Sequence, residues 1–229
     1  MIELKSVRKK YGRKKVLQDV SFTADKGNIT CLIGINGVGK STVLKAIMGL
    51  TPIDGGSILI DGMPIGKHIY EHITYVPDNI TMPPNMTVGA SMQFMKDFYA
   101  SWNEERAEEM LTFFKLKRTD RIAELSKGNT AKLNLLHGLS LDVDYVLMDE
   151  PFSGIDIFSR EQIASVFTSK LVEDRGVIIT THEINDIEHL IDEVVLIDNG
   201  TVTRQFNCED MRMEHGKSVM DVMREVYHG

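Results

Sequence analysis

Residues 34–41 read GINGVGKS, a short stretch in which three glycines precede a lysine and a serine. The run GNITCLIGI that leads into it is apolar and rich in β-branched residues, whereas residues 41–50 place apolar side chains at helical spacing. A glycine loop between a buried strand and a helix turns successive backbone N–H groups and the positive end of the helix toward one point. The segment therefore predicts a strand, a tight loop and a helix that together bind an anion.

The loop matches the pattern G-x-x-x-x-G-K-[ST], the P-loop, at every position. Gly37 and Gly39 are small enough for the backbone to approach phosphate oxygens. We expect Lys40 to neutralise the β- and γ-phosphates of a nucleotide and the hydroxyl of Ser41 to ligate Mg²⁺. The loop thus predicts a nucleoside triphosphate site.

A second motif, YVLMDEP at residues 145–151, is an apolar strand that ends in two carboxylates. In P-loop enzymes this arrangement holds the metal ion and positions the attacking water. We expect Asp149 to hold Mg²⁺, directly or through water, and Glu150 to act as the general base. The alternative is that the two acids only terminate a strand.

Apolar strand patterns alternate with helical patterns along most of the chain. Because each strand is nearly all apolar, the pattern predicts an α/β fold with a mostly parallel sheet covered on both faces. Strand signals disappear over residues 85–135, which predicts a helical lobe inserted into that core, and the segment INDIEHLI at 184–191 predicts a helix. Asn103 or Ser101 is expected to cap a helix within the lobe, and the Asn-Gly pair at 199–200 predicts a turn between two strands.

With these motifs the chain resembles the ATP-binding subunits of ABC transporters over essentially its whole length. Tyr11 stands where these proteins stack an aromatic ring on adenine, and LSKGN at 125–129 takes the place of the LSGGQ signature. SGID at 153–156 follows Glu150 as the D-loop does, and His182 stands where the switch histidine contacts the γ-phosphate. The motifs follow one another in the order of the family.

The resemblance implies one domain over residues 1–229, with a RecA-like P-loop NTPase core, an N-terminal antiparallel β subdomain and the helical signature lobe at 85–135. It implies ATP and Mg²⁺ as cofactors and ATP hydrolysis as the activity. The implied catalytic residues are Lys40, Glu150 and His182, and the implied metal ligands are Ser41, Asp78 and Asp149. The implied nucleotide contacts are Tyr11, Asn36, Gly37, Gly39, Lys40, Ser41, Thr42, Ser126 and Gly128.

Ser126 and Gly128 precede the helix NTAKLNLL and form a second anion-binding half-site. We expect the P-loop and the signature of one chain to lie too far apart to face the same nucleotide. The resemblance implies that two subunits pack head to tail, so that each signature completes the other subunit's ATP site. The partner is a second identical or related nucleotide-binding subunit.

Three positions depart from the family pattern: Asp78 replaces a glutamine, Lys127 the first signature glycine, and Asn129 the signature glutamine. A carboxylate binds Mg²⁺ more strongly than an amide does but donates no hydrogen bond to water. We therefore expect Asp78 to keep the metal contact and to lose part of the water positioning. Lys127 either adds a cation near the partner's γ-phosphate or points to solvent.

Composition and charge narrow the function classes. The 229 residues carry 26 Lys and Arg against 33 Asp and Glu, a net charge of −7 that argues against a nucleic-acid ligand. The basic run RKKYGRKK at 8–15 is expected to be a solvated hairpin edge. Without CxxC spacing the cysteines indicate neither a disulfide framework nor a zinc site, and Cys31 is expected to be a buried hydrophobe. The charged start and the lack of an apolar run of about 18–20 residues favour a cytoplasmic protein.

The function that we expect is the energy-coupling ATPase of an exporter, bound to the cytoplasmic face of the membrane through a separate ABC-2 type permease. In Asp78 and in the sequence LSKG at 125–128, the chain resembles Gram-positive exporters of drugs or amphipathic antimicrobial peptides. Importers, ABC ATPases of nucleic acid or ribosomes, and P-loop kinases are the alternatives. The segment 79–102 is rich in Met and aromatics. It either forms the core of the lobe, through Met92, Met95, Phe98 and Trp102, or receives a helix of the membrane subunit.

Overall fold

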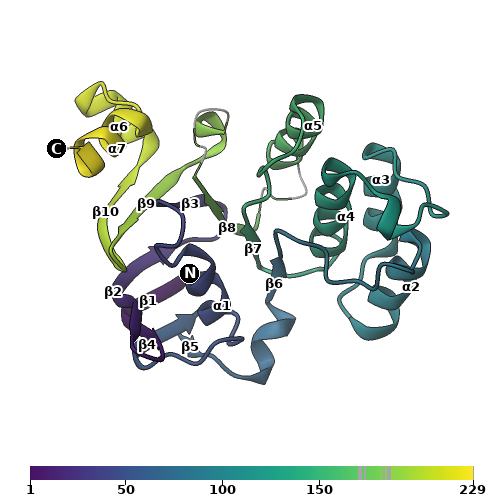
Figure 1. Cartoon of the computed structure of the whole chain (residues 1–229), viewed down its shortest axis with the longest axis horizontal. Helices are drawn as coiled ribbons and strands as arrows, with labels where there is room; N and C mark the ends of the chain where they lie inside the picture. Colours follow the sequence, from purple (N-terminus) through teal and green to yellow (C-terminus); the bar gives the residue numbers. More distant parts are fainter. Residues whose placement is uncertain (170–171, 173, 183, 185–186, 229) are drawn as a thin grey trace.

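A single mixed sheet runs through the molecule (Figure 1). The computed structural model describes residues 1–169, 172, 174–182, 184 and 187–228. The ten strands of this sheet pair in the order β5-β4-β1-β2-β10-β9-β3-β8-β7-β6. Their bounds are β1 Ile2–Tyr11, β2 Lys14–Ala24, β3 Ile29–Ile33, β4 Gly55–Ile60, β5 Met63–Pro64, β6 Ile73–Val76, β7 Tyr145–Asp149, β8 Gly176–Thr181, β9 Glu193–Asp198 and β10 Thr201–Asn207.

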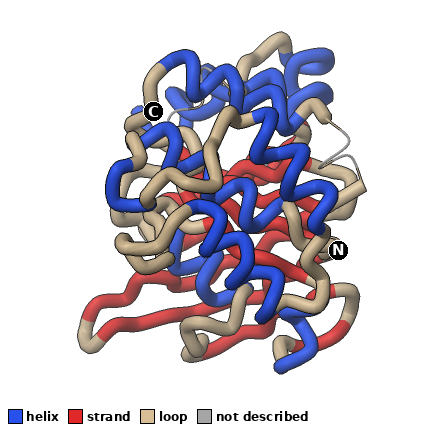
Figure 2. Tube along the Cα trace, turned by 90° about the vertical axis from the view of Figure 1, so that its right-hand side faces the viewer, coloured by secondary structure: helices blue, strands red, loops and turns tan. Residues whose placement is uncertain are grey.

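The helices connect and cover these strands (Figure 2). The α-helices are α1 Lys40–Ile47, α2 Val88–Phe98, α3 Glu104–Phe113, α4 Lys127–Leu139, α5 Ile157–Phe167, α6 Cys208–His215 and α7 Val219–His228. Within the described residues, the short 3₁₀ helices are η1 Lys67–Glu71, η2 Ile122–Glu124 and η3 Glu188–Leu190.

The five strands β9, β3, β8, β7 and β6 are parallel and carry the buried centre of the sheet. Every residue of β7 and β8 is buried, which explains why their sequences are continuous apolar runs rather than alternating ones. The N-terminal strands β1, β2, β4 and β5 pair antiparallel. The expected α/β P-loop core with an antiparallel N-terminal part is confirmed.

Alternate side chains of β3 enter two separate cores. Leu32 joins the cluster under α1 and the N-terminal strands, whereas Cys31 and Ile33 join the cluster beneath the remaining helices. This period of two is the geometry of a strand, and it places the end of β3 between two packed layers. Cys31 is fully buried, as predicted.

The inserted lobe contains α2, α3 and the first part of α4, which lie together at the right of Figure 1. Asn103 caps α3, since its side-chain oxygen accepts a hydrogen bond from the N–H of Arg106 at 3.0 Å. Met92 and Met95 lie in the core, as one interpretation of this segment predicted, and Trp102 packs partly buried against it. That interpretation is wrong for Phe98, which is 71% exposed and stacks on Phe94 at the surface.

The C-terminal part differs from the expectation in two ways. Among the described residues of 184–191, only Glu188–Leu190 form a helix, and it is a single 3₁₀ turn; residues 185 and 186 lie outside the described part. Two helices not anticipated from the sequence, α6 and α7, follow β10. Asn207 begins α6 by accepting two backbone hydrogen bonds, and Gly216 ends it in the left-handed conformation. The Asn-Gly turn at 199–200 joins β9 and β10 as predicted, with positive φ at both residues.

Candidate functional site

The glycine loop lies where β3 ends and α1 begins, at Lys40. Gly37 and Gly39 have φ of +82° and +116°, values that side chains rarely allow. A Cβ on Gly39 would also lie 2.8 Å from a methyl carbon of Leu17 on β2. The N-terminal hairpin thus packs directly on the loop, and glycine is required there for both space and conformation.

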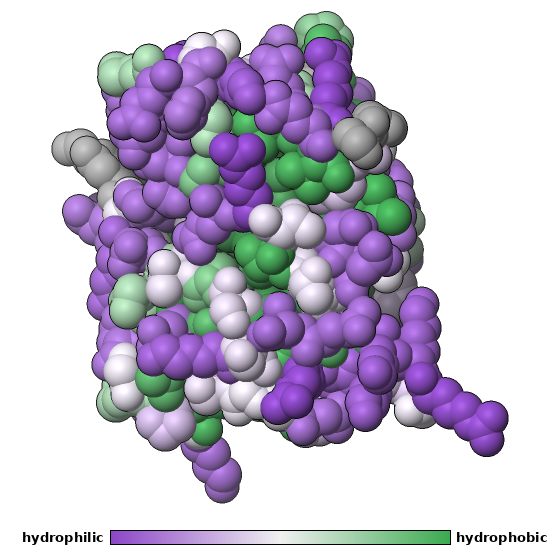
Figure 3. All heavy atoms as spheres, turned by 90° about the vertical axis from the view of Figure 1, so that its left-hand side faces the viewer, coloured by the Kyte–Doolittle hydropathy of each residue, from purple (hydrophilic) through white to green (hydrophobic). Residues whose placement is uncertain are grey.

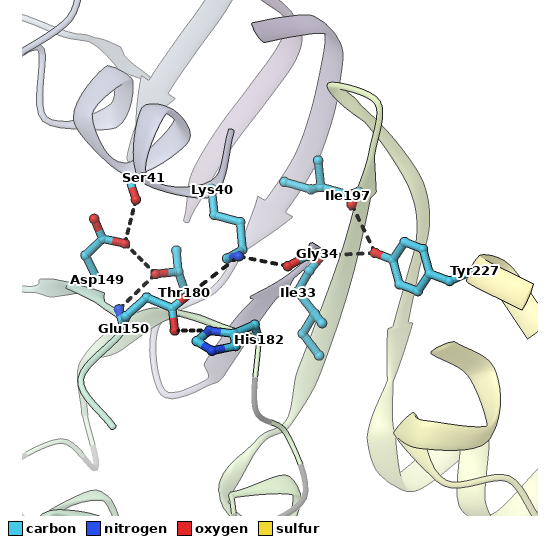
Figure 4. Close-up of polar contacts among 10 residues, drawn as sticks. All are labelled: Ile33, Gly34, Lys40, Ser41, Asp149, Glu150, Thr180, His182, Ile197 and Tyr227. Atoms are coloured by element: carbon cyan, nitrogen blue, oxygen red, sulfur yellow. Dashed lines mark hydrogen bonds and ion pairs between the residues drawn. The ribbon is translucent and has the colours of Figure 1, made fainter. Parts of the chain in front are cut away.

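Lys40 lies at the centre of a polar chain drawn in Figure 4. Its side chain is only 6% exposed, and its Nζ donates a hydrogen bond to the carbonyl oxygen of Gly34 at 2.8 Å. The same Nζ lies 3.4 Å from Oε1 of Glu150, whose Oε2 lies 2.9 Å from Nδ1 of His182. The structure therefore joins the three predicted catalytic side chains in one row.

Asp149 is buried at the end of β7 and accepts hydrogen bonds from three hydroxyl groups. Oδ1 accepts from Ser41 Oγ at 2.9 Å and from Thr180 Oγ1 at 2.6 Å, while Oδ2 accepts from the hydroxyl of Tyr75 at 3.0 Å. Sequence reasoning found Ser41 and missed Thr180 and Tyr75. Both missed residues lie near the ends of predicted strands beside β7, and that position was the available signal.

Glu150 follows Asp149 directly, yet the two carboxylates lie in different surroundings. Glu150 has a φ of +48°, an uncommon conformation for a residue with a side chain. Its N–H donates to Oγ1 of Thr180 at 3.0 Å, which holds this sharp turn. The turn directs one acid to the serine of the loop and the other to Lys40 and His182, a separation that suits two different roles.

Oxygen atoms suited to Mg²⁺ lie around Ser41 and Asp149. Asp78 is exposed and lines a small cavity together with Glu150 and Lys127. Burial, followed by the charge of Asp149, raises the pKa of Tyr75, so this phenol stays a hydrogen-bond donor at neutral pH. The described residues contain no cluster of three or more His, Cys, Asp or Glu side chains suited to a metal. A bound Mg²⁺ ion typically has only one or two protein ligands and takes its other oxygen ligands from phosphates and water.

Three further predicted nucleotide contacts, Asn36, Thr42 and Tyr11, lie on or near the N-terminal part of the sheet. Asn36 is exposed in the glycine loop, and Thr42 lies partly buried in the first turn of α1. Tyr11 is 50% exposed at the end of β1, and the ammonium of Lys9 lies 5.2 Å from its ring centroid. The basic run at 8–15 forms this β1–β2 hairpin, as expected, and its other basic side chains are exposed. Lys9 differs from the expectation, because it is buried and its Nζ donates to the carbonyl oxygen of Pro52.

The signature residues lie on another element, the N-terminus of α4 in the right-hand group of helices (Figure 1). Ser126 caps α4 by accepting a hydrogen bond from the N–H of Asn129 at 3.2 Å. Gly128 packs so closely on the start of α5 that a Cβ would lie 2.4 Å from Oγ of Ser159. The side chain of Lys127 lies over Gly154 of the D-loop in its own chain.

Comparison with known proteins agrees with this geometry. The family model described as ABC transporter matches residues 17–153. The ATP-binding protein YtrB of Bacillus subtilis is 30% identical over 223 residues, which cover 96% of this chain and 76% of YtrB. The chain belongs to the ABC transporter family. It is therefore an ATP-binding ATPase of that family, in which ATP hydrolysis is the reaction.

Other relatives of this ABC ATPase have names that state different roles, resistance in one case and import in another. The linearmycin resistance protein LnrL of B. subtilis is 34% identical and the match covers 87% of this chain and 67% of LnrL. The aliphatic sulfonates import protein SsuB of Corynebacterium glutamicum is 32% identical, with 90% and 84% covered. A solved ATP-binding subunit of an ABC transporter superposes with a TM-score of 0.87 at 27% identity, with 99% of each chain covered.

In the described part of the chain, none of the helices combines the length and the apolar character needed to cross a bilayer.

Proposed function

We propose that this ABC ATPase powers export by a separate permease, through ATP bound between two subunits. The observation that carries the ATP-driven part of the proposal is the row of Lys40, Glu150 and His182 beside the Ser41–Asp149 pair. It supplies a cation for phosphate, a carboxylate for the attacking water and a histidine next to that carboxylate. The transported substrate would be a drug or an amphipathic antimicrobial peptide.

The ion pair between Lys40 and Glu150 implies that ATP binding must precede the activation of Glu150. Because Lys40 is nearly buried and contacts both Gly34 and Glu150, arrival of a triphosphate requires its ammonium to turn toward the phosphates. Glu150 then loses one partner and is free to accept a proton from water, with His182 holding its other oxygen. When bound through Ser41, Asp149 and Asp78, Mg²⁺ would neutralise phosphate charge.

A Glu150→Gln variant tests this chemistry. The amide keeps the shape but accepts no proton, so we expect phosphate release to fall at least a hundredfold while ATP binding stays within a few-fold of the wild type. The measurements are phosphate release and binding of a fluorescent ATP analogue. Glu161→Gln on the exposed surface of α5 serves as the control. A Glu150→Gln variant that hydrolyses ATP at the wild-type rate would exclude Glu150 as the general base.

We further propose that the permease docks into a groove of about 390 Å³ between β6 and the inserted lobe. Met82, Met86, Met95 and Tyr99 line this groove, and the exposed stack of Phe94 and Phe98 flanks it. Adaptable methionines beside aromatic rings suit the apolar face of an inserted helix. Pro77 lines the groove and precedes Asp78, so a helix in this groove would lie close to a proposed metal ligand.

Cysteine crosslinking to the permease tests the groove. Native Cys31 and Cys208 are buried and leave a low background. We expect Phe94→Cys and Phe98→Cys to crosslink to cysteines in the cytoplasmic loops of the permease, whereas Met213→Cys on α6 does not. Equal labelling at all three positions, or none in any nucleotide state, would contradict this docking site.

Export is proposed from Asp78, from the LSKGN sequence of the signature and from the likeness to LnrL, a protein named for resistance. Import is the second candidate, favoured by the similarity to SsuB. Reconstitution with the permease distinguishes the two. In proteoliposomes with the ATPase outside, export predicts ATP-dependent uptake of an amphipathic peptide into the lumen, and import predicts release.

A further inference from the structure

The C-terminal helix α7 packs with one apolar face against the edge of the core. Val219 and Val222 are buried, and Met220, Met223 and Val226 pack partly buried on the same cluster that contains Ile33. Figure 3 shows this side of the molecule, where polar side chains dominate the outer surface. The packing fixes the last turn of α7, which carries Tyr227, relative to β3 and β9.

Tyr227 directs its hydroxyl at the ends of these two strands (Figure 4). The hydroxyl oxygen lies 3.0 Å from the carbonyl oxygen of Ile197 on β9 and 3.4 Å from that of Ile33, the last residue of β3. Its single proton is donated mainly to Ile197, with Ile33 as a weaker second acceptor. One side chain of α7 therefore bridges two neighbouring strands where the glycine loop begins.

The same point of the backbone is constrained from the other side. Gly34 follows Ile33, and its carbonyl oxygen accepts the hydrogen bond from Lys40. A Cβ on Gly34 would lie 2.5 Å from the carbonyl oxygen of Ile197, so this glycine touches the acceptor that Tyr227 holds. Burial raises the pKa of Tyr227 to about 12, and the phenol remains a donor at neutral pH.

We propose that Tyr227 is a positioning residue for ATP binding, which fixes the first residue of the phosphate-binding loop through the carbonyls of Ile197 and Ile33. The inference rests on the proposed function of that loop. It gives the C-terminal helix pair a role in nucleotide affinity, although Tyr227 does not touch the nucleotide itself. Loosening the start of the loop weakens the ATP-bound arrangement and leaves the reacting groups, Glu150 and His182, in place.

A Tyr227→Phe variant of the full chain tests this proposal. One hydrogen bond is lost without a change in packing, so we expect the KM for ATP and the dissociation constant of a fluorescent ATP analogue to rise about three- to tenfold, with kcat within twofold of the wild type. The matched control is Tyr70→Phe, because the Tyr70 hydroxyl donates to the carbonyl oxygen of Met48 at 3.1 Å, at the opposite end of α1. That variant should keep the wild-type KM.

Thermal unfolding of both variants separates positioning from general stability. Comparable melting temperatures together with a raised KM in Tyr227→Phe alone support the proposal. An unchanged KM, a fall in kcat without a change in KM, or equal effects of the two variants would overturn it. If the wild type itself failed to bind ATP, the proposed function would fail instead, so the two failures are distinguishable.

Discussion

Two buried threonines on neighbouring strands, Thr180 on β8 and Thr30 on β3, differ in the hydrogen bonds that their hydroxyl groups make. The hydroxyl of Thr180 donates to Asp149 at 2.6 Å and accepts from the N–H of Glu150. The hydroxyl of Thr30 has no hydrogen-bond partner within the part of the chain that the structure describes. Identical substitutions at the two positions therefore separate hydrogen bonding from the change in shape.

We predict that Thr180→Val lowers the free energy of unfolding by about 1.5–3 kcal/mol, the range for a hydrogen bond to a charged group. Thr30→Val removes an unsatisfied polar atom and should be neutral or stabilising by up to about 1 kcal/mol. Urea unfolding at neutral pH measures both. Similar losses in the two variants would mean that the contact with Asp149 contributes little.

At Asp78 the prediction concerns the metal. Replacing this carboxylate by the family's usual amide in Asp78→Gln weakens a Mg²⁺ contact and restores a donor for water. We expect the Mg²⁺ concentration for half-maximal ATPase activity to rise several-fold and the turnover at saturating Mg²⁺ to change. Titration of the metal measures both, with Asp97→Asn on the exposed face of α2 as the control. Unchanged values would exclude Asp78 as a metal ligand.

Helices α2 and α4 are joined by a buried hydrogen bond between Ser91 and His137. Because the hydroxyl of Ser91 donates to the carbonyl of Val88 at 2.7 Å, it accepts from Nε2–H of His137 at 3.0 Å. Burial lowers the pKa of His137 from 6.5 to about 4. The folded lobe therefore contains the neutral ring, because folding would bury the charge of a protonated His137.

This shift predicts an acid sensitivity of the lobe. Below pH about 6.5 the unfolded chain binds a proton on His137 that the folded chain does not, so the free energy of unfolding falls as the pH drops toward 4, by about 3 kcal/mol at most. His137→Gln keeps a donor without a titrating group. Urea unfolding at pH 5 and 7.5 should show a smaller difference for this variant than for the wild type; an equal difference would contradict the assignment.

At the level of elements, the sequence predicted the parts of the fold whose pattern is local. The P-loop, the strand ending in Asp149 and the Asn-Gly turn each depend on residues next to one another. The prediction of a helix over 184–191 is wrong for its described residues, because apolar spacing alone does not distinguish a helix from a 3₁₀ turn that packs Leu190 against the core. Tyr75, Thr180 and Tyr227 were missed because their roles depend on contacts between strands and helices far apart in sequence.

For the whole molecule, the separation of the P-loop from Ser126 leads to a prediction about assembly. If two copies pack head to tail, Lys40→Ala inactivates the P-loop half of a composite site and Ser126→Arg inactivates the signature half. Each variant alone should lose at least 90% of the ATPase activity, whereas their mixture should regain part of it, because mixed dimers contain one intact composite site. Activity of the mixture that equals the average of the separate variants would exclude a shared site.

The exposed stack of Phe94 and Phe98 bears on how the protein behaves before it assembles with any other subunit. Two aromatic rings that remain in water on the outside of a folded lobe attract other apolar surfaces without regard to their identity. Newly synthesised copies that have not yet bound a partner protein would be the form most prone to aggregate or to bind chaperones. The number of working molecules in a cell would then follow the supply of whatever covers these rings.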